Sequence, residues 1–304
     1  KIKVIFKDEN IIQIKDNGRG IPVEPHPEYP DKSALEVIFT TLHSGGKFSN
    51  KIYTNSGGLH GVGISVVNAL SEFLQVEVVR NKILWMQKFK DGIPLTELKN
   101  LGKSNNRKGT SITFKPNMKY FQNSISFDPK IIFELLKIKS LLNNNLEIEW
   151  INEVKTSNNN FLPKKQIFKY SKGLLDYLNI ETNGKSQLNE SFFSGKINNE
   201  YLKFEWIVTW LIPNEKGKII SHCNTIKTPL GGTHELGIKT CLLKGIKKWI
   251  EISGHKKFQS INVEDITKEC VIIISLFIKN PEFQGQTKQK LVNTNLPKLI
   301  EYNL

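Results

Sequence analysis

The chain has 304 residues, of which 38% are hydrophobic and 24% are charged, and its net charge is +14. This composition excludes wholesale disorder, and the longest apolar run, at 271–278, is far short of the roughly 18–20 residues that a membrane helix needs. Three cysteines without a CxxC pair exclude a disulfide framework and a cysteine-rich zinc module, so a cytoplasmic protein is expected. The positive charge favours nucleic acid or nucleotides as partners, although a solvated lysine-rich surface explains it equally well.

The first half of the chain predicts strands with helices between them. Residues 33–36 have the S-x-x-E spacing of a capping box, which opens a helix that ends near residue 42. A second helix is expected from about residue 62, because one helical stripe there is apolar. That stripe consists of Val62, Val66, Ala69, Leu70 and Phe73. Strands are expected at 1–7, 11–15, 75–80, 83–89, 110–115 and 146–151, with a further helix near 129–142.

The second half predicts another mixed segment. Strands are expected at about 201–210, 217–224 and 271–278, and helices at about 233–250, near 263–270 and at the end of the chain. The predicted strands and helices indicate an α+β fold, and the length of the chain allows two domains or one large one.

A carboxylate and two glycines follow the second predicted strand, in Asp16-x-Gly18-x-Gly20. A carboxylate fixed at a strand end can accept a hydrogen bond from an exocyclic amine such as that of adenine. Glycines let the backbone pass close to a flat ring, because they have no Cβ. By itself the pattern is more typical of a hairpin turn.

A glycine-rich segment, 57–63, opens the helix expected near residue 62. Exposed N–H groups and the helix dipole favour phosphate at such a place. The segment is neither a Walker A loop nor a Rossmann fingerprint, because GK[ST] is missing and a long loop rather than a strand precedes it. A phosphate site and an ordinary helix-entry loop are equally good interpretations of this segment alone.

Two further short motifs carry little information by themselves. Gly109-Thr110 enters a strand, and its hydroxyl could support a carboxylate or a bound ring through water. Gln286-Thr287-Lys288 lies in a loop, where a lysine can act as a point charge on a terminal phosphate.

Taken together and in order, these motifs resemble the ATP site of the GHKL ATPases, and specifically that of the B subunits of bacterial type IIA topoisomerases. Residues 20–48 and 223–235 are more similar to the topoisomerase IV branch than to the gyrase branch. The matching segments are DNGRGIP at 16–22, TTLHSGGKF at 40–48, SGGLHGVGISVVNALS at 56–71, KGTSITF at 108–114, GGTHE at 231–235 and EFQGQTKQKL at 282–291.

The resemblance implies a role for each matching residue. Asp16 would accept from the adenine amino group with water-mediated support from Thr110, and Arg19 and Arg80 would lie at the mouth of the site. Gln286 and Lys288 would contact the γ-phosphate from the second domain. The wall beside the base would be Gly18, Gly20, Ile21 and Pro22, and the triphosphate would be wrapped by Lys47, Gly58, Leu59, His60, Gly61, Val62, Gly63 and Ile64.

The resemblance also implies a GHKL α/β sandwich at 1–180 and a smaller transducer domain at 181–304. ATP with Mg²⁺ would bind, a second copy of the chain would close a clamp on DNA, and the topoisomerase IV A subunit would complete a nucleoid-associated, cytoplasmic enzyme. The family's general-base Glu and Mg²⁺-binding Asn lie upstream of the DNGRGIP motif and are not found before Asp16, so we expect a fragment without its catalytic base. There are four alternatives: a gyrase B subunit, a nucleotide-binding module without turnover, another GHKL branch and a plain DNA-binding module. The QTK and GGTHE motifs count against another GHKL branch, and the occurrence of SGGLHGVG and QTK in order counts against a plain DNA-binding module.

Overall fold

The computed structural model describes residues 1–44, 61–121, 126–154, 162–258 and 260–304. The chain forms two compact units that divide between Ser171 and Lys172, and each unit is described by itself. Within these described ranges, no helix is long and apolar enough to cross a membrane.

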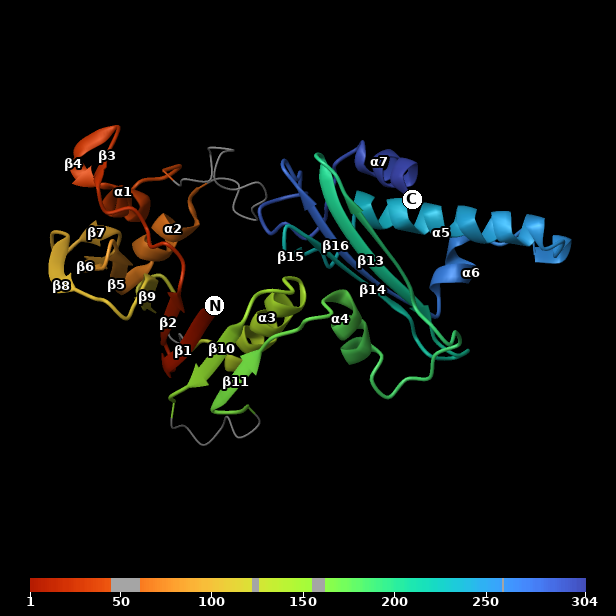
Figure 1. The fold of residues 1–304 in the computed structure, drawn as a ribbon, viewed down its shortest axis with the longest axis horizontal. Helices are drawn as coiled ribbons and strands as arrows, with labels where there is room; N and C mark the ends of the chain where they lie inside the picture. Colours follow the sequence, from red (N-terminus) through yellow and green to blue (C-terminus); the bar gives the residue numbers. More distant parts are fainter. Residues whose placement is uncertain (45–60, 122–125, 155–161, 259) are drawn as a thin grey trace. The chain divides into compact units, whose positions relative to one another are not determined.

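The first unit is built on a mixed sheet in which nine described strands take part (Figure 1). Its order is β11-β10-β1-β2-β9-β5-β6-β7, with β8 also paired to β6, and β1 and β10 run parallel while the other pairs are antiparallel. The strands are β1 (Ile2–Asp8), β2 (Ile11–Asp16), β5 (Ser71–Arg80), β6 (Ile83–Lys90), β7 (Ile93–Pro94), β8 (Lys99–Lys103), β9 (Gly109–Pro116), β10 (Ile148–Asn152) and β11 (Lys165–Phe168). A separate hairpin consists of β3 (Pro25–His26) and β4 (Tyr29–Ser33).

Three described helices belong to the first unit: α1 (Ala34–Thr40), α2 (Gly63–Ala69) and α3 (Pro129–Leu141). The predicted helix start after Ser33 is confirmed, since its side chain accepts a hydrogen bond from the backbone N–H of Glu36. Asp128 caps α3 in the same way, ahead of a proline at the first helical position. One apolar cluster joins α1 to β5 and β6, and another joins α3 to β1, β2 and β10.

The predicted apolar stripe of the second helix is wrong. Helix α2 ends at Ala69, and Phe73 lies in strand β5. Val66 is 41% exposed, whereas Asn68 is fully buried and donates to the backbone carbonyl of Phe39, 2.9 Å away. The two-residue alternation of Leu74, Val76 and Val78, all buried, continues β5 and overrides the helical period.

The second unit contains a five-stranded sheet of order β12-β13-β16-β14-β15, in which β14 and β16 are parallel. Helices α5 and α7 lie along one face of it and α4 along the other (Figure 1). The strands are β12 (Phe193–Asn198), β13 (Leu202–Trp210), β14 (Lys218–Cys223), β15 (Ile226–Lys227) and β16 (Cys270–Ile278). The helices are α4 (Leu174–Glu181), α5 (Thr233–Ile252), α6 (Val263–Thr267) and α7 (Leu296–Asn303), with a 3-10 turn at Lys256–Phe258.

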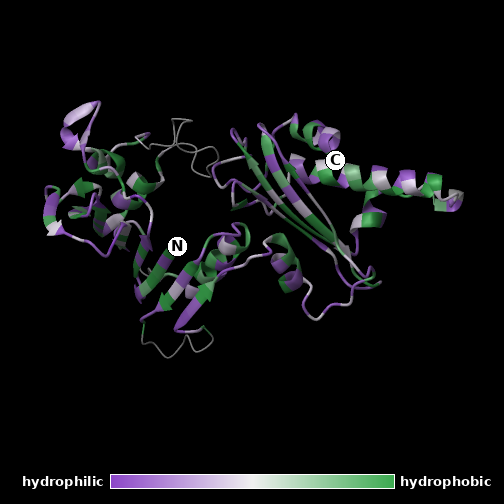
Figure 2. Cartoon of the chain, in the orientation of Figure 1, coloured by the Kyte–Doolittle hydropathy of each residue, from purple (hydrophilic) through white to green (hydrophobic). Residues whose placement is uncertain are grey.

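The central strand β16 explains why both faces of this sheet are covered. Eight of its nine residues are buried, as expected of a strand with an almost continuous apolar sequence. Figure 2 shows the contrast with α5, along which hydrophilic residues recur between the apolar ones. Helix α4 packs on β13 and β16, so all of it belongs to the second unit, whereas the boundary expected at residue 180 falls inside this helix.

Candidate functional site

The first part of the site is the end of strand β2, where Asp16 begins a tight turn. Its Oδ1 atom accepts from the backbone N–H of Gly18 at 2.7 Å and, at the long distance of 3.4 Å, from that of Thr110 on β9. The residue remains exposed, so its carboxylate can receive a further donor. The structure therefore brings together the carboxylate, the first glycine and the threonine that the sequence analysis singled out.

Glycine at position 109 makes this closeness possible. Its φ is +97°, and a Cβ there would lie 2.2 Å from the carbonyl oxygen of Asp16. Gly20 is confined in a similar way, because φ is +78° and a Cβ would lie 2.9 Å from Val78 Cγ1. The two glycines let the turn after β2 lie directly against β9 and β5.

Thr110 is 7% exposed, and its side chain connects β9 to the turn. Its hydroxyl oxygen accepts from the backbone N–H of Ile21 at 3.2 Å. This bond holds the residues expected to form the wall of the site, Ile21 and the adjoining Pro22, against the strand that carries Thr110.

An apolar surface lies beside the Asp16 carboxylate. Ile14 precedes Asp16 by two residues in the same strand, so both side chains lie on one face of the sheet. Ile12 on that face is buried, but Ile14 is 41% exposed. A carboxylate next to uncovered apolar surface suits a flat, weakly polar ring that carries an amino group.

A basic pocket of about 430 Å³ opens beside Gly18. Two arginines of this pocket form ion pairs. Arg80 Nε lies 2.8 Å from Glu24 Oε1, and Arg107 Nη2 lies 2.9 Å from Glu77 Oε2. Hydrogen bonds from backbone N–H groups and from Arg80 hold the pKa of Glu24 below its ordinary value. The cationic residues that line the pocket are Arg19, Arg80, Lys82, Arg107 and Lys108. The pocket favours an anionic or electron-rich ligand, and its Arg107, Lys82 and Lys108 were not among the residues predicted to be at the mouth.

The expected phosphate segment is only partly described. Gly61, Val62, Gly63 and Ile64 lie at the start of α2, where no side chain caps the helix. Lys47, Gly58, Leu59 and His60 lie outside the described residues. Their expected roles on the triphosphate stay predictions.

Gln286 and Lys288 belong to the second unit, in the loop between β16 and α7. Both Gly285 and Lys288 have left-handed backbone, with φ of +79° and +56°, and the N–H of Lys288 donates to the carbonyl of Gly285 at 3.3 Å. The loop is thus a defined turn of the second unit, and the γ-phosphate contact expected of Gln286 and Lys288 stays a prediction.

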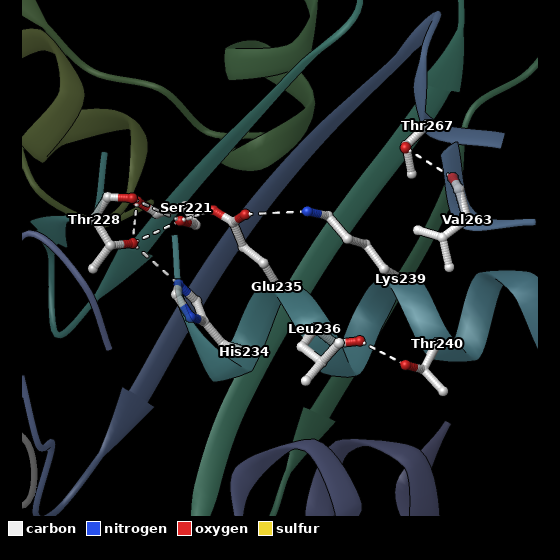
Figure 3. Close-up of polar contacts among 9 residues, drawn as sticks. All are labelled: Ser221, Thr228, His234, Glu235, Leu236, Lys239, Thr240, Val263 and Thr267. Atoms are coloured by element: carbon white, nitrogen blue, oxygen red, sulfur yellow. Dashed lines mark hydrogen bonds and ion pairs between the residues drawn. The ribbon is translucent and has the colours of Figure 1, made fainter. Parts of the chain in front are cut away.

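A buried polar cluster near this loop was missed at the sequence level. It comprises Ser221, Thr228, His234 and Glu235, the last two from the GGTHE segment (Figure 3). The only available signal was a His-Glu pair that follows Gly231-Gly232-Thr233. In the described ranges no three His, Cys, Asp or Glu side chains lie together as a metal site.

Comparison with known families assigns both units. Residues 1–120 match the family of histidine kinase-, DNA gyrase B- and HSP90-like ATPases, and residues 173–303 match the DNA gyrase B family. The fold and the site thus define a GHKL-type ATPase domain followed by a gyrase B-type domain, and the predicted fold class is confirmed.

Individual relatives give a finer assignment. The chain is 43% identical over 302 residues to the B subunit of DNA topoisomerase 4 from Rickettsia prowazekii, and 43% identical over 305 residues to that from Bartonella bacilliformis. These matches span 99% of this chain but only 45% and 44% of the relatives. The topoisomerase IV ATP-binding domain of Francisella tularensis is 32% identical with a TM-score of 0.77, covering 99% of this chain and 78% of that one.

A gyrase structure is also similar. The 43K ATPase domain of Thermus thermophilus gyrase B, solved with an aminocoumarin, is 28% identical with a TM-score of 0.78, covering 99% of this chain and 75% of that one. The identities favour the topoisomerase IV branch, as the sequence analysis expected. The chain belongs to the family of topoisomerase IV B subunits, among the type IIA topoisomerases, and corresponds to the ATPase region of that family.

Proposed function

We propose that this chain binds ATP on its first unit, with the adenine against Ile14 and its amino group donating to Asp16. The observation that carries the proposal is the exposed Asp16 carboxylate, held in place by Gly18 and Thr110 beside an uncovered apolar side chain. Thr110 would support the base through water, and the wall beside it would be Gly18, Gly20, Ile21 and Pro22.

The triphosphate would extend from this site toward the start of α2. The family resemblance supports phosphate binding by residues 58–64 and Lys47, and a γ-phosphate contact by Gln286 and Lys288. Mg²⁺ would accompany the nucleotide phosphates, as the family resemblance implies. These assignments come from family membership and not from observed contacts.

In the complete protein we infer a role in changing DNA topology. ATP would favour a closed dimer of two copies only if that state adds contacts that the open state lacks, such as Lys288 to the γ-phosphate. Closure would enclose a DNA segment, and hydrolysis would reopen the clamp, with the topoisomerase IV A subunit as the partner. A net charge of +14 supports DNA as the ligand and a nucleoid-associated, cytoplasmic location.

Replacement of Asp16 by Asn tests the adenine contact. The amide oxygen can still accept from Gly18, but the charge-assisted bond to the adenine amino group is lost. We expect adenine-nucleotide binding to weaken by about 1.5–3 kcal/mol, roughly tenfold to hundredfold, in calorimetric titrations with ADP and with a non-hydrolysable ATP analogue.

The matched control is Asp8→Asn, because Asp8 also ends a strand and accepts from the next backbone N–H, at 2.8 Å. That variant should bind like the unmodified chain. Unchanged affinity in Asp16→Asn would contradict the adenine site. A second comparison addresses turnover, with this chain beside one that is extended at its N-terminus. If both bind ATP but only the extended chain hydrolyses it, the 304 residues are a nucleotide-binding module without turnover.

A further inference from the structure

The loop that carries Gln286 and Lys288 is fastened to the segment before helix α5. The N–H of Leu230 donates to the carbonyl of Gln289 at 3.0 Å, and the N–H of Leu291 donates to that of Gly231 at 3.1 Å. Thr233 N–H in turn donates to the carbonyl of Leu291, also at 3.1 Å. Three backbone bonds in succession therefore fix where the loop leaves the core.

The segment bonded to this loop is a turn that contains two glycines with positive φ. Gly231 and Gly232 have φ of +68° and +144°. A Cβ on Gly232 would lie 2.2 Å from the carbonyl oxygen of Leu291, and a Cβ on Gly231 would lie 2.7 Å from Oε2 of Glu235. The turn is thus packed between the loop on one side and the Glu235 carboxylate on the other.

A chain of side-chain hydrogen bonds joins Ser221, Thr228, His234 and Glu235 next to this turn (Figure 3). The Ser221 hydroxyl donates to Glu235 Oε1 at 2.6 Å, and the hydroxyls of Ser221 and Thr228 are also 2.6 Å apart. Thr228 Oγ1 lies 3.1 Å from His234 Nε2, and its backbone carbonyl accepts from Gly231 N–H at 2.9 Å. Both hydroxyl residues are about 2% exposed, so these bonds are sheltered from water.

We infer that Thr228 and Glu235 are positioning residues for the Gln286–Lys288 loop, so that they control preference for a nucleoside triphosphate over a diphosphate. They act by fixing the Gly231-Gly232 turn, to which the loop is fastened. Neither residue is proposed to touch the nucleotide. The inference rests on the proposed function, because it requires Lys288 to contact the γ-phosphate.

The test compares Thr228→Val with Thr228→Ser. Valine keeps the branched shape and removes the hydroxyl, whereas serine keeps the hydroxyl. We expect backbone hydrogen exchange of residues 284–292 to accelerate by roughly threefold to tenfold in Thr228→Val. Affinity for a non-hydrolysable ATP analogue should fall by a similar factor, roughly threefold to tenfold, while affinity for ADP stays unchanged. Thr228→Ser should restore both properties.

Thr267→Val is the matched control, since the Thr267 hydroxyl donates to the Val263 carbonyl within α6 at 2.8 Å (Figure 3). It should alter neither exchange of 284–292 nor the ratio of the two affinities. If Thr228→Val does not fold, Ser221→Ala interrupts the same chain and is measured instead. Equal loss for both nucleotides, or unchanged exchange and ratio, overturns the positioning role. A wild-type chain that binds neither nucleotide overturns the proposed function itself.

Discussion

At the scale of single residues, Lys288 carries the most specific expectation. We expect Lys288→Ala to leave ADP affinity unchanged and to weaken a non-hydrolysable ATP analogue by roughly tenfold or more, because only the triphosphate presents a terminal phosphate to the ammonium group. Calorimetric titration of both nucleotides measures the difference. Lys290→Ala alters the same loop two residues away and serves as the control. Equal loss for both nucleotides in Lys288→Ala would contradict the γ-phosphate assignment.

His234 is a second residue with a measurable property, because it is completely buried. Burial, helped by the charge of Lys239, lowers the pKa of His234 to about 4 from its ordinary 6.5. The unfolded chain therefore takes up a proton at higher pH than the folded chain does. His234 thus stabilises the fold fully above pH 6.5. Its contribution is lost as the pH falls from 6.5 through about 4.

We expect the free energy of unfolding to decrease by about 2 kcal/mol between pH 7.5 and pH 5 on account of His234. Urea titrations at the two pH values measure it. His234→Asn should be less stable at pH 7.5 but should show a correspondingly smaller decrease toward pH 5. The same pH dependence in both proteins would show that His234 titrates at its ordinary pKa.

The candidate site was predictable only where a short motif carries its function. Asp16 and Thr110 were both identified from the sequence, and the structure brings them together through Gly109. Ser221 and Thr228 were not identified, because isolated hydroxyl residues in strands and turns have no distinguishing sequence pattern. Their importance appears only when the fold places them against Glu235 and His234.

At the scale of elements, Asn68 connects helices α1 and α2 of the first unit. Its Nδ2 donates from α2 to the Phe39 carbonyl of α1, and the residue is fully buried. We expect Asn68→Ala to lower the free energy of unfolding by about 1–3 kcal/mol, because the Phe39 carbonyl loses a buried partner. Chemical denaturation measures the loss.

The control for Asn68→Ala is Asn143→Ala. Asn143 also donates to a backbone carbonyl, that of Lys139, at 2.8 Å, but it is only partly buried. Water can replace its bond, so the expected loss is smaller. Equal losses in the two variants would mean that burial does not set the strength of the Asn68 bond.

Elements with a clear period were predicted well, and those formed by pairing were not. The strands β1 and β13 and the long helix α5 lie close to their predicted ranges, because apolar residues there follow a period of two or of 3.6. Strand β8, Lys99–Lys103, is exposed throughout and is not among the strands predicted from the sequence. It is a strand because it pairs with β6, and its own sequence does not predict that pairing.

At the scale of the whole chain, each of three apolar clusters among the described residues lies within one unit. The cluster of β13, β16, α5 and α7 belongs to the second unit, and the clusters around β1, β10 and α3 and around α1, β5 and β6 belong to the first. Each unit thus buries its own core, which is the usual condition for independent cooperative unfolding. ADP should stabilise only the first unit, because a ligand raises the stability of the state that binds it.

Two isoleucines allow this independence to be tested in calorimetric melting of the 304-residue chain. Ile274 on β16 is fully buried in the second unit, and Ile148 on β10 is 1% exposed in the first. Each Ile→Ala change should cost about 2–5 kcal/mol, because it removes buried methyl groups and leaves a cavity. Ile274→Ala should lower the transition that ADP does not shift and leave ADP affinity unchanged, whereas Ile148→Ala should lower the transition that ADP raises. If either variant moves both transitions together, the two units unfold as one. ATP binding to the first unit would then also stabilise the second, even without contact between Lys288 and the γ-phosphate.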